Sequence, residues 1–289
     1  MRVPHGNRVT GSLGFTGLAL LGILALSMPA RAEGDTWKEL QGNVFPDKRI
    51  EADSPLVSLS APTRAEDAAL VPVDVTVALP EGDARTVSAV TLIVDENPAP
   101  VAASFRFGPG RHAVTLSTRL RVNSYSFVRA VAETSDGQLH MAARFVKASG
   151  GCSAPALKDA DEALAHLGEM RFRLFGKPDT PAMTPLPQAQ LMIRHPNNSG
   201  LQMDQLTRLY IPARFVRHVT VRQGDELVLE MEGGISLSED PTLRFSVARP
   251  GRFEVVAEDT DGKVFKRDFD VQAFSGEVGT ASPSENATN

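Results

Sequence analysis

The sequence predicts an all-β protein made of two antiparallel β-sandwiches, joined by an amphipathic helix and a proline-rich linker. Three observations carry this prediction: two groups of short runs rich in β-branched and apolar residues, turn signals between those runs, and one interval of helical periodicity between the groups. The elements follow in chain order.

The first group of runs lies between Val71 and Lys147 and predicts six strands. The runs are "VPVDVTVAL", "VSAVTLIVD", "VAASFRF", "HAVTLSTRL", "SFVRAVAET" and "QLHMAARFVK". Asn97-Pro98, Gly108-Pro109-Gly110 and Asp136-Gly137 are among the turn signals that separate them. Strands joined by such short turns favour an antiparallel sandwich.

Helical periodicity replaces the strand pattern between residues 155 and 174. Apolar residues recur there at intervals of three or four, at Leu157, Ala160, Leu164, Leu167, Met170 and Leu174. Ser153 can cap the start of such a helix, and Gly176 and Pro178 can end it. The proline-rich "GKPDTPAMTPLPQ" then predicts a linker, so residues 153–185 are assigned to the helix and linker.

The second group of runs predicts a smaller β-sandwich over residues 186–274. Its strands are "AQLMIRH", "FVRHVTVR", "ELVLEME", "TLRFSVA", "RFEVVAED" and "VFKRDFDV". The final residues, 275–289, are small and polar, a composition typical of a disordered tail.

The first 32 residues have the composition of a signal peptide. Arg2 and Arg8 precede the apolar run "LGFTGLALLGILAL", and Ala30 and Ala32 provide an A-x-A cleavage site. A retained membrane anchor is the alternative, but the run is short for a membrane span. We therefore expect a periplasmic protein that has no membrane contact once the signal peptide is removed.

The charge of the expected mature chain excludes one class of partner. Loss of Arg2, Arg8 and Arg31 leaves 27 basic against 35 acidic residues, a formal net charge of −8. An acidic protein does not attract nucleic acid or an anionic membrane electrostatically, so neither is expected to be a partner.

No conventional catalytic motif is present in the sequence. There is no H-E-x-x-H metal motif, no G-x-S-x-G nucleophile elbow and no P-loop, and the chain has a single cysteine. We therefore expect neither an enzyme nor a bound metal or cofactor.

Two polar stretches of the second group are candidate partner contacts. "IRHPNNSG" places His195 beside two asparagines and a serine, and "RLYIPARFVRHVTVR" places Arg217 among other basic residues. The alternatives are an ordinary turn for the first stretch and the solvent face of a strand for the second. His195 and Arg217 remain the candidate contact residues.

Cys152 is the strongest candidate for chemistry. Gly150 and Gly151 precede it and give the backbone freedom, and a helix start just beyond it would favour the thiolate. A lone cysteine can instead be a small buried apolar residue. Its position between a strand and a linker favours an exposed, functional thiol, which could also link two chains in a disulfide dimer.

Longer stretches of the sequence resemble a known family. "STRLRVNSYSFVRAVAETSDGQLHMAARFVKASGGC" resembles the SoxY sulfur carrier, and "IRHPNNSGLQMD" together with "DPTLRFSVARPGRFEVVAEDTDGKVFKRDFDV" resembles its partner SoxZ. The chain thus looks like a fused SoxYZ-like carrier of the kind associated with quinoprotein dehydrogenases. One departure is that SoxY ends just beyond "GGCGG", whereas Ser153, Ala154 and Pro155 follow the cysteine here.

The resemblance implies a fold and a function. It implies immunoglobulin-like sandwiches that share an interface, SoxY-like over residues 33–152 and SoxZ-like over 186–274. It also implies that Cys152 carries sulfur-containing intermediates covalently on a flexible arm formed by Gly150 and Gly151. The partners would be periplasmic sulfur-oxidation enzymes or a quinoprotein dehydrogenase. Two alternatives are a noncovalent accessory protein of a periplasmic quinoprotein (PQQ) alcohol dehydrogenase and a thiol-dependent enzyme.

The signal peptide gives the first testable prediction. Cleavage after Ala32 should leave Glu33 as the first residue of the exported protein, because the "ARA" site follows the apolar run directly. Amino-terminal sequencing of periplasmic material checks this, and recovery of periplasmic protein that still begins at Met1 would contradict it.

Overall fold

The computed structural model describes residues 33–156, 160–175 and 187–272. The predicted signal peptide (1–32), most of the proline-rich linker and the predicted tail (275–289) lie outside these residues. We call residues 33–156 the amino-terminal half and residues 160–272 the carboxyl-terminal half.

The amino-terminal half contains one helix and eight strands among its described residues. They are α1 (Glu33–Val44), β1 (Ile50–Ala52), β2 (Val57–Ser60), β3 (Val71–Ala78), β4 (Val87–Val94), β5 (Val101–Phe107), β6 (Ala113–Leu120), β7 (Ser126–Thr134) and β8 (Leu139–Val146). The six predicted strands of this half are confirmed as β3 to β8. Sequence reasoning missed α1, β1 and β2.

The carboxyl-terminal half contains a short helix and seven strands among its described residues. They are α2 (Ala160–Ala165), β9 (Met170–Phe175), β10 (Gln188–Ile193), β11 (Val216–Gln223), β12 (Glu226–Gly233), β13 (Thr242–Ser246), β14 (Gly251–Asp259) and β15 (Val264–Val271). The six predicted strands of this half are confirmed as β10 to β15.

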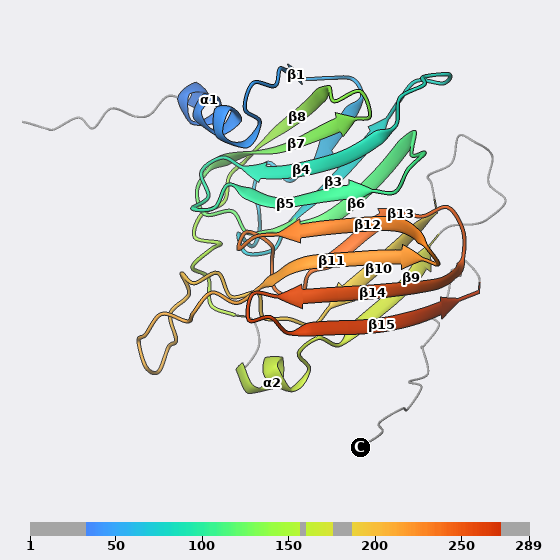
Figure 1. Ribbon diagram of the computed structural model, residues 1–289. Helices are drawn as coiled ribbons and strands as arrows, with labels where there is room; N and C mark the ends of the chain where they lie inside the picture. The colour runs from blue at the N-terminus through green and yellow to red at the C-terminus, as the bar shows by residue number, and fades with distance from the viewer. Residues whose placement is uncertain (1–32, 157–159, 176–186, 273–289) are drawn as a thin grey trace, which may run out of the picture. The chain divides into compact units, whose positions relative to one another are not determined.

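The strands form two sheets, and each sheet contains strands from both halves (Figure 1). The larger sheet has the order β1-β8-β7-β4-β5-β12-β11-β14-β15, and the smaller has the order β2-β3-β6-β13-β10-β9. Within the described residues all pairings between these strands are antiparallel except that of β1 with β8. The predicted pair of antiparallel sandwiches is therefore confirmed, and the two share their sheets.

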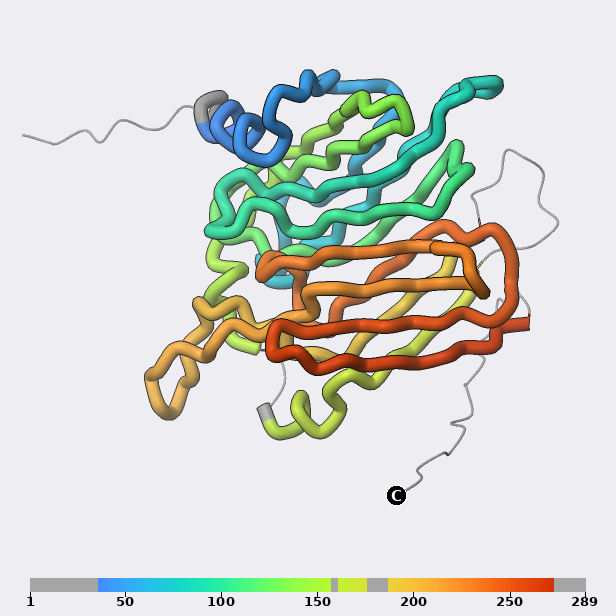
Figure 2. The backbone as a smooth tube through the Cα atoms, viewed as in Figure 1, coloured from blue at the N-terminus to red at the C-terminus, as the bar shows by residue number. Residues whose placement is uncertain are grey.

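The halves join edge to edge in both sheets. In the larger sheet β5 pairs with β12, where Phe105 lies opposite Met231, and Figure 2 shows the two strands side by side. In the smaller sheet β6 pairs with β13, where Leu116 lies opposite Phe245. These pairings confirm the shared interface, and they satisfy backbone groups that would otherwise lie on four open sheet edges.

The hydrophobic core lies between the sheets and continues through both halves. Strand β3 shows the pattern most simply, because its four valines are buried while the residues between them are exposed. The same core cluster includes Leu116 and Phe105 from the amino-terminal half and Leu191 and Phe245 from the carboxyl-terminal half. The halves therefore do not have separate cores.

Helix α1 covers a second, smaller apolar cluster on the outer face of the larger sheet. Trp37 and Leu40 of α1 pack there with buried Ile93 and Val131. The Arg129 guanidinium lies 4.2 Å from the centre of the Trp37 ring, a cation–π contact. Helix α1 therefore belongs to the fold, although its sequence lacks a strong apolar stripe.

The predicted helix over residues 155–174 is wrong over its second part. Only α2 is helical among the described residues of this interval, and Met170–Phe175 form strand β9, which pairs with β10. The sequence "MRFRLF" alternates as a strand does, with Phe172 and Leu174 buried, and Phe172 stacks on Phe269 at 5.3 Å between ring centres. An apolar pair four residues apart, such as Met170 and Leu174, fits both the helical and the strand period. The burial of Phe172 against other aromatic rings favours the strand. Neither α1 nor α2 is long and apolar enough to cross a membrane.

The shared sheets predict that the two halves unfold together. Phe105→Ala, at the β5–β12 seam, should destabilise the protein by about 3–5 kcal/mol because Phe105 is fully buried. Trp37, the single tryptophan, reports on the amino-terminal half, and far-ultraviolet circular dichroism reports on both halves. Urea unfolding curves from the two signals should coincide in the wild type and shift together in the variant. Two separated transitions would contradict this prediction.

Candidate functional site

The segment around Cys152 is docked on the amino-terminal half. The Gly150 amide donates to the Asn123 carbonyl at 2.8 Å, and the Gly151 amide donates to the Val122 carbonyl at 3.0 Å. Only glycine fits at position 151, because a Cβ atom there would lie 2.0 Å from the Ala68 carbonyl oxygen. Gly150 and Gly151, the predicted flexible arm, are therefore held by backbone hydrogen bonds in this state of the protein, and their flexibility stays a prediction.

Cys152 is fully buried, with 0% of its surface exposed, and its thiol is free. Burial raises the pKa of the thiol to about 11, and the nearby positive charge of Arg121 opposes that rise. Among the described residues, those directly after the thiol, 153–156, are not helical, and α2 is described over Ala160–Ala165. The expected exposed, thiolate-favouring cysteine is therefore corrected to a buried, protonated one.

Residues of the carboxyl-terminal half hold the cysteine segment in place. The Ser199 hydroxyl donates a short hydrogen bond to the Cys152 carbonyl. The Gln202 side-chain amide donates to the Ala154 carbonyl at 3.1 Å, and its oxygen accepts from the Ser199 amide at 3.0 Å. We call Ser199 and Gln202 the clasp. Both residues are buried, so these bonds are shielded from water.

Arg121 lies next to the segment around Cys152, and only 1% of its surface is exposed. It follows β6 directly, and its two terminal nitrogens donate to the Gly151 carbonyl at 3.1 Å and the Asn197 carbonyl at 3.4 Å. Burial lowers the pKa of Arg121, and electrostatic interactions with Glu239, Cys152 and Asp67 oppose the lowering. Arg121 therefore connects the cysteine segment to the carboxyl-terminal half.

His195 is buried beside this connection. Its Nδ1 accepts from the Asn197 amide at 3.0 Å, so the proton of the neutral ring lies on Nε2, which is 3.5 Å from Asp259 Oδ2. Burial lowers the pKa of His195 and keeps the ring neutral. The prediction that His195 is a partner contact is wrong, because only 1% of its surface is exposed.

Asp259 is the anchor that orients His195. Its Oδ2 accepts from Arg214 Nε at 3.0 Å and Nη2 at 2.9 Å. Burial raises the pKa of Asp259, but hydrogen bonds from the Lys263 amide and from Arg214 outweigh it, so the pKa lies below its ordinary value. A charged Asp259 holds both His195 and Arg214, which fixes the base of the loop that carries the clasp.

That loop is an extended hairpin over residues 198–214, which we call the clasp hairpin. Asn198 bridges to Arg214 at its base and Met203 to Tyr210 further out, and Figure 1 shows it projecting beyond the ends of β11 and β14. It carries five of the eight exposed large apolar side chains among the described residues: Leu201, Met203, Leu206, Leu209 and Tyr210. Such a concentration of exposed apolar surface is typical of a contact site.

The second predicted contact residue, Arg217, is exposed on β11. Its guanidinium forms an ion pair with Glu258 of the neighbouring strand β14. Its role as a contact stays a prediction.

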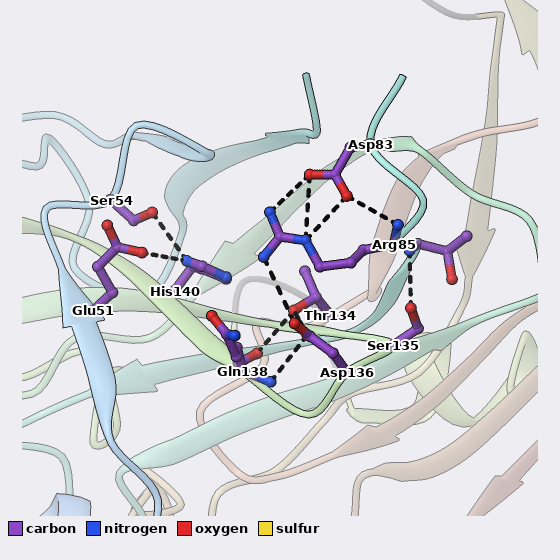
Figure 3. Close-up of polar contacts among 10 residues, drawn as sticks. Glu51, Ser54, Asp83, Arg85, Thr134, Ser135, Asp136, Gln138 and His140 are labelled. Atoms are coloured by element: carbon purple, nitrogen blue, oxygen red, sulfur yellow. Dashed lines mark hydrogen bonds and ion pairs between the residues drawn. The ribbon is translucent and has the colours of Figure 1, made fainter. Parts of the chain in front are cut away.

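A second polar cluster lies in the amino-terminal half (Figure 3). The buried His140 Nδ1 is 2.7 Å from Glu51 Oε2 and 3.1 Å from Ser54 Oγ. A serine–histidine–acid triad requires the serine and the acid on opposite ring nitrogens, whereas here both face the same one. Nearby, Asp83 and Arg85 form an ion pair at 2.7 Å that fixes the loop before β4. We interpret this cluster as structural.

Within the described residues no group of three or more potential ligands is placed to hold a metal ion.

Sequence reasoning singled out Cys152 but missed the residues that surround it. Within "IRHPNNSG" the sequence favours a turn at Asn-Ser-Gly, and the preceding Asn197 does lie at a φ of 44°, yet Ser199 and Gln202 bond to the cysteine segment. The sequence carries no signal for Arg121. In "RLRVN" it stands between apolar Leu120 and Val122, an alternation that predicts an exposed arginine, whereas all three residues are buried.

The fold and site define a class of protein: a two-part β-sandwich chain with one cysteine held where the parts meet. Comparison with protein families identifies the parts. The family "Sulfur oxidation protein SoxY" matches residues 41–152, and "Sulphur oxidation protein SoxZ" matches residues 179–270. The chain therefore belongs to the fused SoxYZ-like sulfur-carrier family.

Solved structures give weaker likenesses. The sulfur carrier protein SoxY from Chlorobium limicola f thiosulfatophilum is 25% identical, with a TM-score of 0.32, over 40% of this chain and 94% of its own. A superoxide reductase (neelaredoxin) from Ignicoccus hospitalis is 16% identical, with a TM-score of 0.28, over 34% of this chain and 93% of its own. No curated protein sequence matches the chain. The family assignment rests on the two domain matches.

The buried thiol predicts a pH dependence of stability. Between its ordinary pKa of 9.0 and its folded-state pKa of about 11, the unfolded chain loses the thiol proton while the folded chain keeps it. The free energy of unfolding should therefore be unaffected by this group below pH 9 and fall by roughly 2–3 kcal/mol as the pH rises to 11. Urea unfolding of the wild type and Cys152→Ala across this range isolates the effect. Parallel pH profiles of the two proteins would show that the thiol is not buried.

Proposed function

We propose that this protein is a periplasmic covalent carrier, which holds a sulfur-containing group on Cys152 and presents it to partner enzymes. The match to SoxY supports the proposal most directly, because it extends over residues 41–152 and ends at the cysteine. Cys152 is the one cysteine of the chain, so a group held as a disulfide or thiosulfonate has a single place of attachment. The signal-like first 32 residues support export.

In this proposal the described structure is the closed state of the carrier. A thiol that is fully buried with a pKa of about 11 has almost no reactive thiolate near neutral pH. Loading therefore requires the segment after Gly151 to leave its position, which breaks the bonds to Ser199 and Gln202. Burial in the closed state would protect the free thiol from oxidants of the periplasm and from disulfide-linked dimerisation.

The partners in this proposal are periplasmic sulfur-oxidation enzymes or a quinoprotein dehydrogenase. The clasp hairpin supports a contact near the thiol, because its base holds Cys152 and its outer part exposes Leu206, Leu209 and Tyr210. A partner bound to the hairpin would be placed beside the cysteine segment. Arg217 lies on β11, the strand that follows the hairpin.

A second candidate function is a noncovalent accessory protein of a periplasmic quinoprotein (PQQ) alcohol dehydrogenase. One observation favours it, namely the complete burial of Cys152, which is also the normal environment of a structural cysteine. The two candidates differ in whether the native protein ever exposes its thiol.

Reaction of the folded protein with tetrathionate, followed by intact-mass analysis, tests the carrier. The wild type should gain one reducible adduct slowly, and Cys152→Ala should gain none. Ser199→Ala removes one clasp hydrogen bond, worth about 1 kcal/mol, so its adduct should form roughly fivefold faster. Ser246→Ala is the matched control, because Ser246 is a buried serine on β13 that accepts from the Thr115 amide.

Two results would favour the accessory function instead. One is a wild-type protein that reacts only at denaturant concentrations that unfold it globally. The other is an equal rate in Ser199→Ala and Ser246→Ala, since the clasp would then have no control over access to the thiol.

A further inference from the structure

Two buried nitrogen donors near Cys152 have no hydrogen-bond acceptor in the part of the chain that the structure describes. They are Arg121 Nε and Asn197 Nδ2. Arg121 is 1% exposed and Asn197 is 0% exposed, so bulk solvent does not reach these donors. A buried donor without an acceptor is costly, and a group that binds there in another state is one physical explanation for it.

The two donors belong to one connected arrangement. One terminal nitrogen of Arg121 donates to the Gly151 carbonyl, directly before Cys152, and the other donates to the Asn197 carbonyl. Arg121 comes from the amino-terminal half and Asn197 from the carboxyl-terminal half. The arrangement is therefore complete only where the two halves meet, and the cysteine lies beside it.

Charged and neutral groups surround this arrangement, and two carboxylates already offset part of the positive charge of Arg121. Arg121 interacts electrostatically with the carboxylates of Glu239 and Asp67 and with Cys152. His195, which accepts from the Asn197 amide, is neutral. The negative charge of Asp259 is directed at Arg214 by two hydrogen bonds. In the closed state Cys152 is the one of these neighbours that can acquire a negative charge by loading.

We propose that Arg121 and Asn197 form an anion-binding cradle for the charged end of a group carried on Cys152, and that the cradle discriminates anionic from neutral adducts. The proposal rests on the carrier function and assigns two residues, Arg121 and Asn197, to the recognition of a cysteine adduct that ends in a sulfur oxyanion such as a sulfonate. The tetrahedral oxygens of such a group accept hydrogen bonds from a guanidinium and an amide together.

Two reagents provide a matched pair of adducts. A thiolate attacks one of the two central sulfurs of tetrathionate, forms a new bond from Sγ to that sulfur and breaks the central S–S bond, whose electron pair leaves with thiosulfate. The product is an anionic Sγ–S–SO₃⁻ group on the cysteine. With methyl methanethiosulfonate the thiolate forms a neutral methyl disulfide and releases methanesulfinate. Loading in urea followed by refolding removes any dependence on how the clasp opens.

The experiment compares thermal midpoints of the refolded anionic and neutral adducts of the full chain. In the wild type the anionic form should have the higher midpoint, by at least about 2 °C, because its charge meets Arg121 and its oxygens meet the two donors. Arg121→Gln removes the charge and should abolish the difference. Arg121→Lys keeps the charge but not the planar donor group, and should retain only part of it.

Asn197→Asp is the sharper variant, and it remains informative if the Arg121 variants fail to fold. Aspartate keeps the oxygen that accepts from the Val216 amide and tolerates the positive φ at this position. It replaces the orphan donor by a negative charge, so the neutral adduct should become the more stable of the two. The comparison is made within each variant, so its general destabilisation cancels.

Failure of the cradle and failure of the carrier function give different results. Equal midpoints for the two adducts in the wild type, or a wild-type difference that Asn197→Asp leaves unchanged, would overturn the cradle even where the folded protein loads normally. A folded wild type that never loads would overturn the carrier function, whereas the refolded adducts would still decide whether the cradle binds an anion.

Discussion

Backbone pairing across the seam between the halves is the constraint on which the rest of the structure depends. Strands β5 with β12 and β6 with β13 turn two sandwiches into two shared sheets with one core. The seam also sets the distance between Arg121, which follows β6, and Asn197, which lies between β10 and β11. Each half alone would expose part of the shared core to solvent and would lack half of the site. Folding and function therefore both require the two halves to be paired.

The site combines a protected thiol with an unbalanced set of hydrogen-bond donors. Burial favours the neutral thiol, because a neutral group loses less hydration free energy than a thiolate. The same burial strengthens the electrostatic attraction between Arg121 and any anion in contact with it. Both effects have one physical origin, the exclusion of water by the clasp. The low dielectric environment thus disfavours a bare thiolate while it favours an anion with direct hydrogen bonds, and this contrast is what a carrier needs in order to hold its cargo.

Sequence patterns predicted the strands well because strand burial is a local property. All twelve predicted runs correspond to strands, since alternation such as that of β3 directly reflects which face is buried. The missed elements depend on distant contacts. Strand β9 became a strand because Phe172 stacks on Phe269, almost a hundred residues away. Cys152 was identified, but its burial could not be predicted, because Ser199 and Gln202, which hold its segment, come from the other half of the chain.

The presence of both halves in one chain has a consequence for how the closed state responds to concentration. The clasp residues and the cysteine segment belong to the same polypeptide, so closing is an intramolecular step. Its equilibrium constant has no units of concentration, and dilution cannot shift it as it would shift the association of two separate subunits. The fraction of protected thiol therefore does not depend on the concentration of the protein.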